Sequence, residues 1–472
     1  MILCSGIDNR FRLREHGRRS IANEEQAKLK RVLTFWDVFF IALGQIIGAG
    51  VIALTGVAIG MTGPSVILAY LLAAALVIMV SVLIVFAGAT LPTVGAFYAW
   101  PARLCNGWVG SIVLILIALA SISLSLFGSA VGLYLNPLFP VLSVNMWGVV
   151  VIFVIFLANL LGLEIASRLQ MGLVLVLLSA LGVYAGFAMP QIDTTHLSPM
   201  FPKGLVGFLT AAFLVKFATG GASLIVGLAG EMINPKRTIP LVIFGSTTLV
   251  AVVYGLVALA SVGVLGWEPM VNQPLTVAGK AFLPGWALGY FIVAGAGLAI
   301  CTTLNAQFIQ LPRNFIVASW DNLIPGWVGQ LNRYGAPHII LFAMLVIGAV
   351  PLVAGLDIEA IARAATISAS LPSFFLFWAA TRIPERFPRA YEQSMFKLGR
   401  RWIWVFFALS QISTLVGVIL LAQNLSGLVL GTLGGWVVLA IAYYPIRRRI
   451  LRRNGFDLDA ATTNPTLLNV SD

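Results

Sequence analysis

Residues 44–51, with the sequence GQIIGAGV, place glycines at positions 44, 48 and 50 of an otherwise apolar run that begins near Trp36. Glycine weakens a helix by about 1 kcal/mol relative to alanine, so this run is interrupted in its middle. One interpretation is a broken helix, whose freed backbone N–H and C=O groups would bind the charged ends of a zwitterion. The other is a glycine face that lets two helices pack closely.

A second interrupted run favours the broken helix. Residues 213–223, with the sequence FLVKFATGGAS, lie in the sixth apolar run of the chain. Two five-helix halves related as inverted repeats would place interruptions in the first and sixth helices, with a binding site between them. We therefore predict that backbone groups at two breaks hold the substrate, namely at Ile46, Ile47, Gly48, Ala49, Gly50, Thr219, Gly220 and Gly221.

The composition predicts a protein that lies mostly in lipid. Hydrophobic residues make up 60% of the 472 residues and charged residues only 10%, a balance foreign to water-soluble domains. The predicted fold is an all-α polytopic membrane protein with about twelve transmembrane helices of about 20 residues each. The runs begin near Trp36, Ser65, Gly107, Met146, Leu169, Val206, Leu241, Trp286, His338, Glu359, Trp402 and Ser426. The connection at residues 91–98 is expected to lie in water or to dip back toward the membrane.

The basic residues predict the orientation. If the N-terminal tail is cytoplasmic, only Lys203, Lys280 and Arg363 of the 29 basic residues fall on the external side, and Lys216 falls inside a span. Short cytoplasmic loops retain positive charge, so both termini are expected in the cytoplasm. The membrane is expected to be the cell inner membrane. We expect a tail at residues 1–35, one transporter domain at 36–446, and a polar tail at 447–472. Within the domain, the repeats cover about 36–190 and 206–381, and two extra helices cover about 402–446.

Several classes of chemistry are not expected. The basic residues are spread over short loops, which argues against nucleic acid as a partner. The cysteines and histidines never gather at metal-ligand spacing, so no metal, cofactor or catalytic residue is predicted. They are Cys4, Cys105, Cys301, His16, His196 and His338.

Lys216 is the ionisable residue placed deepest in an apolar run. It lies about ten residues inside its span, or roughly 15 Å at 1.5 Å per residue, which is deep for a side chain that must reach the interface. An ionisable group at this depth usually faces a cavity or the bundle interior. Lys216 is therefore predicted to change protonation state during transport or to pair with a substrate carboxylate; the alternative is that it snorkels.

The span interiors carry no Asp or Glu, so a cationic substrate would lack counterions. Neutral or acidic amino acids, or related small carboxylates, are the expected substrates. In the eighth span, Thr302 and Thr303 offer oxygens for a possible sodium site, although the same side chains often hydrogen-bond between helices.

The order of motifs resembles the amino acid–polyamine–organocation permease superfamily. The first-span glycines are followed by Gly63-Pro64, the sixth span exits through residues 231–240 (EMINPKRTIP), and the loop after the eighth span holds Arg313 with residues 321–325 (DNLIP) and 332–337 (NRYGAP). The resemblance covers most of the chain. It implies a leucine-transporter-type fold of five plus five inverted helices with two more.

Three departures from that pattern concern the site. Residues 221–223 (GAS) lack the aromatic gate of many relatives, Gly230 precedes Glu231 where a second acid is common, and residues 173–181 lack a lysine that some relatives use in place of sodium. We expect a secondary active transporter working by alternating access, with proton symport favoured over exchange. The alternatives are a solute sensor of the same fold and an intramembrane enzyme, for which the sequence shows no catalytic motif.

Overall fold

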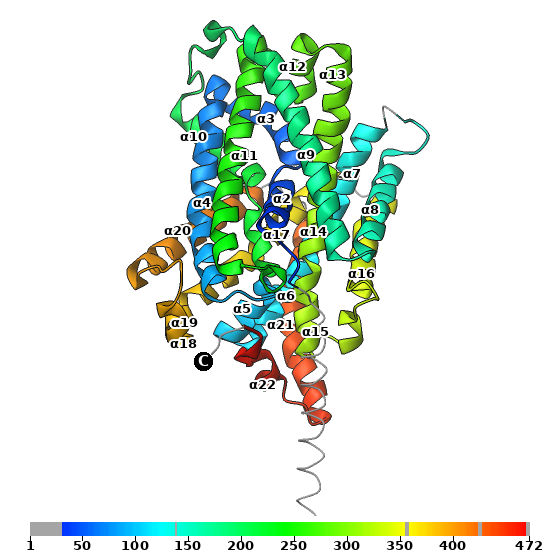
Figure 1. Ribbon diagram of the computed structural model, residues 1–472, viewed down its shortest axis with the longest axis vertical. Helices are drawn as coiled ribbons and strands as arrows, with labels where there is room; N and C mark the ends of the chain where they lie inside the picture. Colours follow the sequence, from blue (N-terminus) through cyan, green and yellow to red (C-terminus); the bar gives the residue numbers. More distant parts are fainter. Residues whose placement is uncertain (1–30, 137–138, 355–357, 423–426, 469–472) are drawn as a thin grey trace, which may run out of the picture.

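The computed structural model describes residues 31–136, 139–354, 358–422 and 427–468, and most of the expected N-terminal tail lies outside these ranges. The described chain is built from helices (Figure 1). Extended pairing within it is limited to two isolated bridges, Leu33 with Met232 and Val94 with Leu228. The predicted all-α fold is therefore confirmed.

The first half of the chain contains the first five expected spans. Its helices are α2 (Phe35–Ile46), α3 (Ala49–Thr62), α4 (Val66–Thr90), α5 (Ala96–Trp100), α6 (Gly107–Ala120), α7 (Ser123–Leu135), α8 (Val144–Leu160) and α9 (Leu163–Ala188). The first span is divided between α2 and α3, and the third between α6 and α7. A capping box between Thr34 and Asp37 starts α2, because each side chain accepts from the other's backbone N–H.

The second half repeats an interruption in its first span. Its helices are α10 (Gly204–Thr219), α11 (Pro235–Leu265), α12 (Leu275–Phe282), α13 (Gly285–Tyr290), α14 (Leu298–Gln310), α15 (Pro312–Trp320), α16 (His338–Val353) and α17 (Ile358–Thr381). Short 3-10 turns at Ala222–Gly227 and Ala229–Glu231 follow α10 in place of a continued helix. The sixth span is therefore half α-helix.

The remaining helices are α18 (Ile383–Arg386), α19 (Pro388–Glu392), α20 (Arg400–Ala422), α21 (Gly427–Arg453) and α22 (Leu458–Thr463). The boundary expected at residue 446 falls inside α21, which continues for seven residues. In the tail expected at 447–472, α22 packs on α6, and the side chains of Leu458 and Leu468 are fully buried. This tail therefore docks on the bundle over residues 458–468.

Five helical segments of the described chain are long and apolar enough to cross a bilayer: Leu54–Thr90, Gly107–Gly132, Leu163–Gln191, Pro235–Leu265 and Gly285–Trp320. Shorter apolar helices supply the other spans in part, among them Phe35–Ile46 and Gly204–Lys216. These two are short because each belongs to a run that breaks in its middle.

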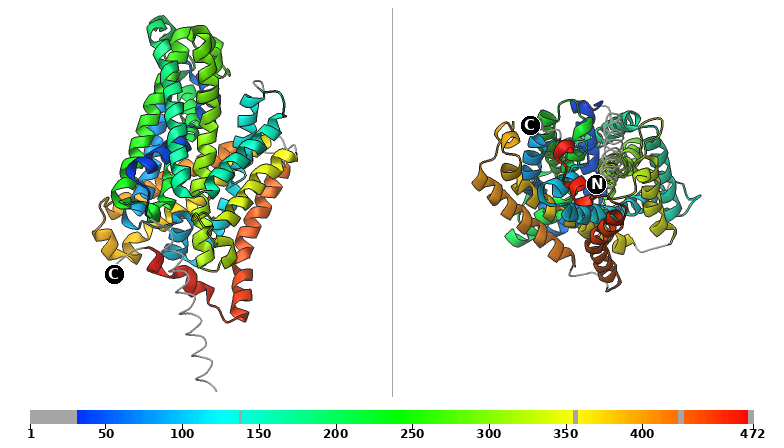
Figure 2. Two further views of the ribbon diagram at one scale, coloured as in Figure 1. Left: turned by 45° about the vertical axis from the view of Figure 1, so that its right-hand side comes forward. Right: turned by 90° about the horizontal axis from the view of Figure 1, so that it is seen from below.

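The helices pack as one bundle with the two broken spans inside it. The central helices α3, α4, α10 and α11 pack against one another, and α9 and α14 pack against α2. In Figure 1, α7, α8 and α16 form a group on one side, and they contact one another. Figure 2 shows α21 along the outer edge of the bundle, where it packs on α6.

One end of the bundle holds α5, α15, α19 and α22, at the bottom of Figure 1; we call it the basic end, because Arg103, Arg313 and the arginines of α21 lie there. The connection at residues 91–98 folds into this end. Its residues are buried, and its backbone pairs with the turn after α10, through Gly95 N–H to the Gly227 carbonyl oxygen at 2.9 Å.

Candidate functional site

The first break lies at Ile47 and Gly48, between α2 and α3. Gly48 adopts an extended conformation (φ −127°, ψ −156°), and no side chain caps the first turn of α3. The first backbone N–H groups of α3 therefore have no partner inside the helix or from a cap. A helix N-terminus in this state attracts an anionic group such as a carboxylate.

The carbonyl groups freed by the first break are held by three hydroxyls. Thr303 donates to the carbonyl oxygen of Gly44 at 3.1 Å, Thr302 to that of Ile47 at 3.2 Å, and Tyr254 to that of Ile46 at 3.2 Å. All three side chains are buried. The break is therefore a fixed feature of the fold, because its carbonyls have specific partners.

The second break lies at Gly220 and Gly221, after α10 ends at Thr219. Gly221 has φ +121°, which an L side chain rarely adopts. The α10 C-terminus leaves its last carbonyl groups without helical partners, although Thr219 donates its hydroxyl to the carbonyl oxygens of Val215 and Lys216. The negative end of the α10 dipole favours a cation such as an ammonium group.

The two breaks lie against each other. A Cβ on Gly221 would lie 3.1 Å from Cγ and 3.3 Å from the carbonyl oxygen of Gln45, and a Cβ on Gly50 would lie 2.8 Å from that of Ala218. Since α3 packs against α10, the free N-terminus of one helix sits beside the free C-terminus of the other. This places the charge preferences for a carboxylate and an ammonium group side by side.

The glycines of the first span also allow close packing, as the second interpretation of the sequence expects. A Cβ on Gly44 would clash with the Gln170 side chain, and a Cβ on Gly48 would clash with the Thr303 hydroxyl. Because Thr303 approaches so closely, it can reach the carbonyl oxygen of Gly44 across the break.

Gln45 is a site residue that the sequence argument did not select. Its side chain is 9% exposed, and its Oε1 atom has no hydrogen-bond partner among the described residues. A buried acceptor without a donor costs about 1–3 kcal/mol. The signal in the sequence was its position between Gly44 and the break, within residues 44–51.

Thr302 and Thr303 lie beside the freed carbonyl groups of the first break, so oxygens of α2 and α14 gather there. Besides the Gly44 and Ile47 carbonyl oxygens, both hydroxyls donate to that of Ala299, at 2.7 and 3.2 Å. The five oxygens are neutral and come from two helices, which suits a hard monovalent cation. The same bonds also satisfy the alternative from the sequence, hydrogen bonding between helices.

A buried chain of carboxamides supports α14 from behind. The Asn159 side chain donates to that of Asn305 at 2.8 Å, Asn305 donates to Gln170 at 2.8 Å, and Gln170 donates to the Thr302 carbonyl oxygen at 3.1 Å. These bonds join α8 and α9 to α14, the helix that carries the two threonines. The signal for Asn159 and Gln170 in the sequence was a carboxamide inside an apolar run.

Lys216 does not join the two breaks. Its Nζ atom donates to the Ser413 hydroxyl of α20, and both side chains are half-buried. The partner lies on an extra helix near the other end of the chain. Lys216 therefore contacts α20 rather than the Thr302 and Thr303 hydroxyls.

Two buried ion pairs cross the basic end. Arg313 donates through Nε and Nη2 to both carboxylate oxygens of Glu231, at 2.9 and 3.2 Å, so the turn after the second break is tied to α15. Arg103 donates to Asp321 at 2.9 and 3.0 Å, and Tyr98 donates to the same carboxylate at 2.7 Å. Burial raises the pKa of Asp321, and Arg103 opposes that shift.

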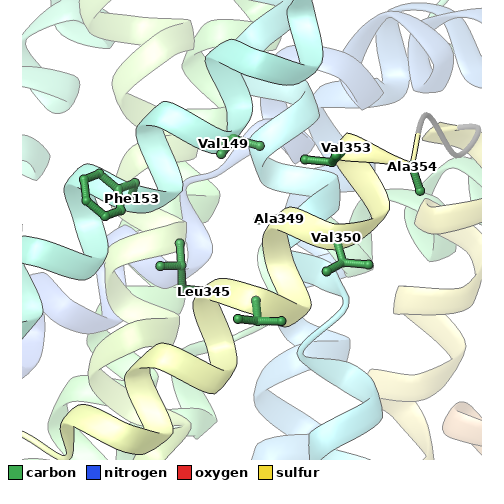
Figure 3. Close-up of a pocket in the computed structure, with 8 residues that line it drawn as sticks. Val149, Phe153, Leu345, Ala349, Val350, Val353 and Ala354 are labelled. Atoms are coloured by element: carbon green, nitrogen blue, oxygen red, sulfur yellow. The ribbon is translucent and has the colours of Figure 1, made fainter.

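A groove between α8 and α16 provides no comparable site. It is lined by Val149, Phe153, Leu345, Val346, Ala349, Val350, Val353 and Ala354, all of them apolar (Figure 3). An amino acid needs polar partners for its charged ends, so this groove does not fit one.

Two broken spans inside a polytopic helical bundle are typical of secondary transporters in the membrane. Residues 33–441 match the model of the amino acid permease family, and the chain belongs to that family.

Curated relatives include cationic amino acid transporters 3 (mitochondrial) and 5 of Arabidopsis thaliana, 26% and 29% identical over 65% and 68% of this chain. The chain spans 54% and 60% of the length of these two proteins. The branched-chain amino acid permease BcaP of Bacillus subtilis is 22% identical, over 67% of this chain and 73% of that protein.

Proposed function

We propose that this protein is a secondary transporter that carries an amino acid across the membrane by alternating access. The observation that most directly supports this proposal is the antiparallel contact of α3 and α10 at the two breaks, with Gly50 against Ala218. The α3 N-terminus would hold the substrate carboxylate, and the α10 C-terminus would hold its ammonium group. Family membership supports the same proposal.

A neutral amino acid is the preferred substrate. The described carboxylates lie at helix ends, turns and loops, as with Glu231 and Asp321, so a cationic side chain at the breaks would lack a counterion. Lys216 pairs with Ser413 rather than facing the breaks, which weakens the case for an acidic substrate. The relatives are named for cationic and for branched-chain amino acids, so the substrate panel must contain both.

Proton coupling is proposed first, and it rests on Lys216 as an ionisable residue inside a span. The oxygens around Thr302 and Thr303 support sodium as the alternative. Exchange without a coupling ion is the remaining scheme. Uptake driven by an imposed proton or sodium gradient, compared with uptake driven only by internal amino acid, separates the three.

The orientation is part of the proposal. We place the basic end in the cytoplasm, because basic residues are retained there. The bonds of Glu231 with Arg313 and of Gly95 with Gly227 then close the cytoplasmic side of the second break. Opening toward the cytoplasm would require these contacts to separate.

The test is counterflow in proteoliposomes with labelled neutral, acidic and cationic amino acids. Gly221→Ala should lower the initial rate at least tenfold, because alanine disfavours φ +121° and its Cβ would press on Gln45. Gly182→Ala in α9 is the matched control, since a Cβ there meets nothing within 4 Å. Unchanged counterflow in Gly221→Ala would remove the proposed site. Binding without counterflow in the wild type would support a sensor instead.

A further inference from the structure

The C-terminal end of α21 carries a cluster of arginines that the proposed function does not use: Arg447, Arg448, Arg449, Arg452 and Arg453. Three of them are engaged by the chain itself. Arg447 donates to the carbonyl oxygens of Asn322 and Leu323 at 3.2 and 3.1 Å, and Arg448 and Arg452 pair with Asp459 at 2.5 and 3.3 Å. These three hold α22 and the loop after α15.

The other two arginines face outward. Arg449 and Arg453 are exposed, and neither has a hydrogen bond or an ion pair with the part of the chain that the structure describes. They alternate with Ile446 and Ile450, which are 57% and 48% exposed. Positions 446, 449, 450 and 453 follow the i, i+3, i+4, i+7 spacing of a single helix face. We call this face the outer stripe.

The outer stripe continues a face that meets the bilayer. Two turns before Ile446 on the same helix face, Leu439 is 45% exposed, and α21 lies along the outer edge of the bundle (Figure 2). An exposed apolar helix face in a membrane protein meets acyl chains. The stripe therefore lies where α21 leaves the hydrocarbon layer, on the side of the helix that faces lipid.

Trp108 indicates the depth of the stripe. Its indole N–H donates to the carbonyl oxygen of Ile441 at 2.9 Å, and its exposed ring is of the kind that gathers at the membrane interface. Arg449 lies eight residues further on, or about 12 Å at 1.5 Å per residue. Arginine side chains in a helix lean toward its N-terminus and extend several Å. The Arg449 guanidinium therefore reaches back to the headgroup layer, which is about 5–7 Å thick.

We propose that the outer stripe binds one anionic phospholipid in the leaflet at the basic end. The phosphate accepts from the guanidinium groups of Arg449 and Arg453, and the upper acyl chain lies on Ile446 and Leu439. Retention of positive charge in the cytoplasm explains why arginines occur at this end. It does not explain why two of them lack internal partners and share a lipid-facing stripe with isoleucines.

The test is native mass spectrometry of the full-length chain in neutral detergent, titrated with phosphatidylglycerol or phosphatidylcholine. We expect one tightly held phosphatidylglycerol in the wild type. Arg449→Gln with Arg453→Gln should weaken that binding about 30-fold, or roughly fivefold for each arginine. The matched control is Arg386→Gln with Arg389→Gln, which removes the same charge from exposed positions of α18 and α19. The control should change binding less than about twofold.

Three outcomes would overturn the proposal. Equal binding of phosphatidylglycerol by the wild type and the Arg449 and Arg453 double variant would dismiss the stripe. An equal loss in the control pair would show a response to net charge alone. Displacement of the lipid by millimolar inorganic phosphate would show a site for the free anion. None of these readouts depends on transport, so the result is separate from that of the counterflow test.

Discussion

Thr303 of α14 donates its hydroxyl to the carbonyl oxygen of Gly44 in α2 over 3.1 Å, across the interruption of the first span. This one bond joins a continuous helix to a broken one. It exists because Gly48 has no side chain to keep the threonine away.

Replacing Thr303 by valine keeps the volume but removes the donor. We expect a loss of about 1 kcal/mol of stability, because the Gly44 carbonyl stays buried without its partner. If sodium binds at this cluster, Thr303→Val should also abolish any stimulation of uptake by a sodium gradient. Thr210→Val is the control, since its exposed hydroxyl donates to the Val206 carbonyl oxygen in the same helix. Equal melting temperatures for wild type and Thr303→Val would show that the bond does not stabilise the break.

Gly48→Ala tests the packing at the same point. The added Cβ would clash with the Thr303 hydroxyl, so we expect a destabilisation of about 1–3 kcal/mol from overpacking and a fall in counterflow. Adding Thr303→Ala opens the space and should restore stability in the double variant, although the bond to Gly44 is lost. A double variant that loses more stability than the two single variants together would contradict this explanation.

Tyr254 and Tyr70 form a matched pair, because their buried rings lie edge to face at 5.3 Å and only Tyr254 reaches the break. Tyr254→Phe frees the carbonyl oxygen of Ile46. Tyr70→Phe removes instead a bond of 2.6 Å to Thr55. We expect both variants to lose about 1 kcal/mol of stability but only Tyr254→Phe to raise the substrate KM in counterflow. A KM that rises equally in the two variants would mean that Tyr254 does not position the break.

Lys216→Met tests proton coupling. If the amine carries the coupled proton, the variant should lose uptake driven by a pH gradient while it keeps exchange counterflow, because exchange needs no net proton movement. Ser413→Ala, which removes the partner of the amine, should keep both activities. Proton-driven uptake that survives in Lys216→Met would assign coupling elsewhere and leave Lys216 as a contact between α10 and α20.

The sequence was sufficient for the helical class and for the positions of both breaks, because glycine clusters act locally on helix stability. It was not sufficient to predict which side chains contact one another. Lys216 and Ser413 are 197 residues apart, and nothing in either segment points to the other. Glu231 and Arg313 were each assigned to connections, yet the fold buries them as a pair. The docking of α22 was also missed, because a six-residue helix in a polar tail has no apolar periodicity to detect.

The pair of Glu231 with Arg313 gives the largest expected effect on stability. Their side chains are 3% and 5% exposed, so Glu231→Gln leaves a buried guanidinium without its counterion, at a cost of about 3–5 kcal/mol. Glu164→Gln is the control. Glu164 and its partner Arg168 are 64% and 69% exposed, and exposed ion pairs contribute about 0–1 kcal/mol to stability.

Thermal unfolding of the purified variants in detergent makes this comparison. If the pair also keeps the cytoplasmic side closed, Glu231→Gln should expose residues 227–231 to a cysteine reagent when Ala229→Cys, at a buried position of this turn, is labelled from that side. Glu164→Gln in the same background should leave the labelling rate unchanged. Similar unfolding temperatures for the Glu231 and Glu164 variants would show that the buried pair does not stabilise the fold, and slow labelling in both would show that other contacts close this end.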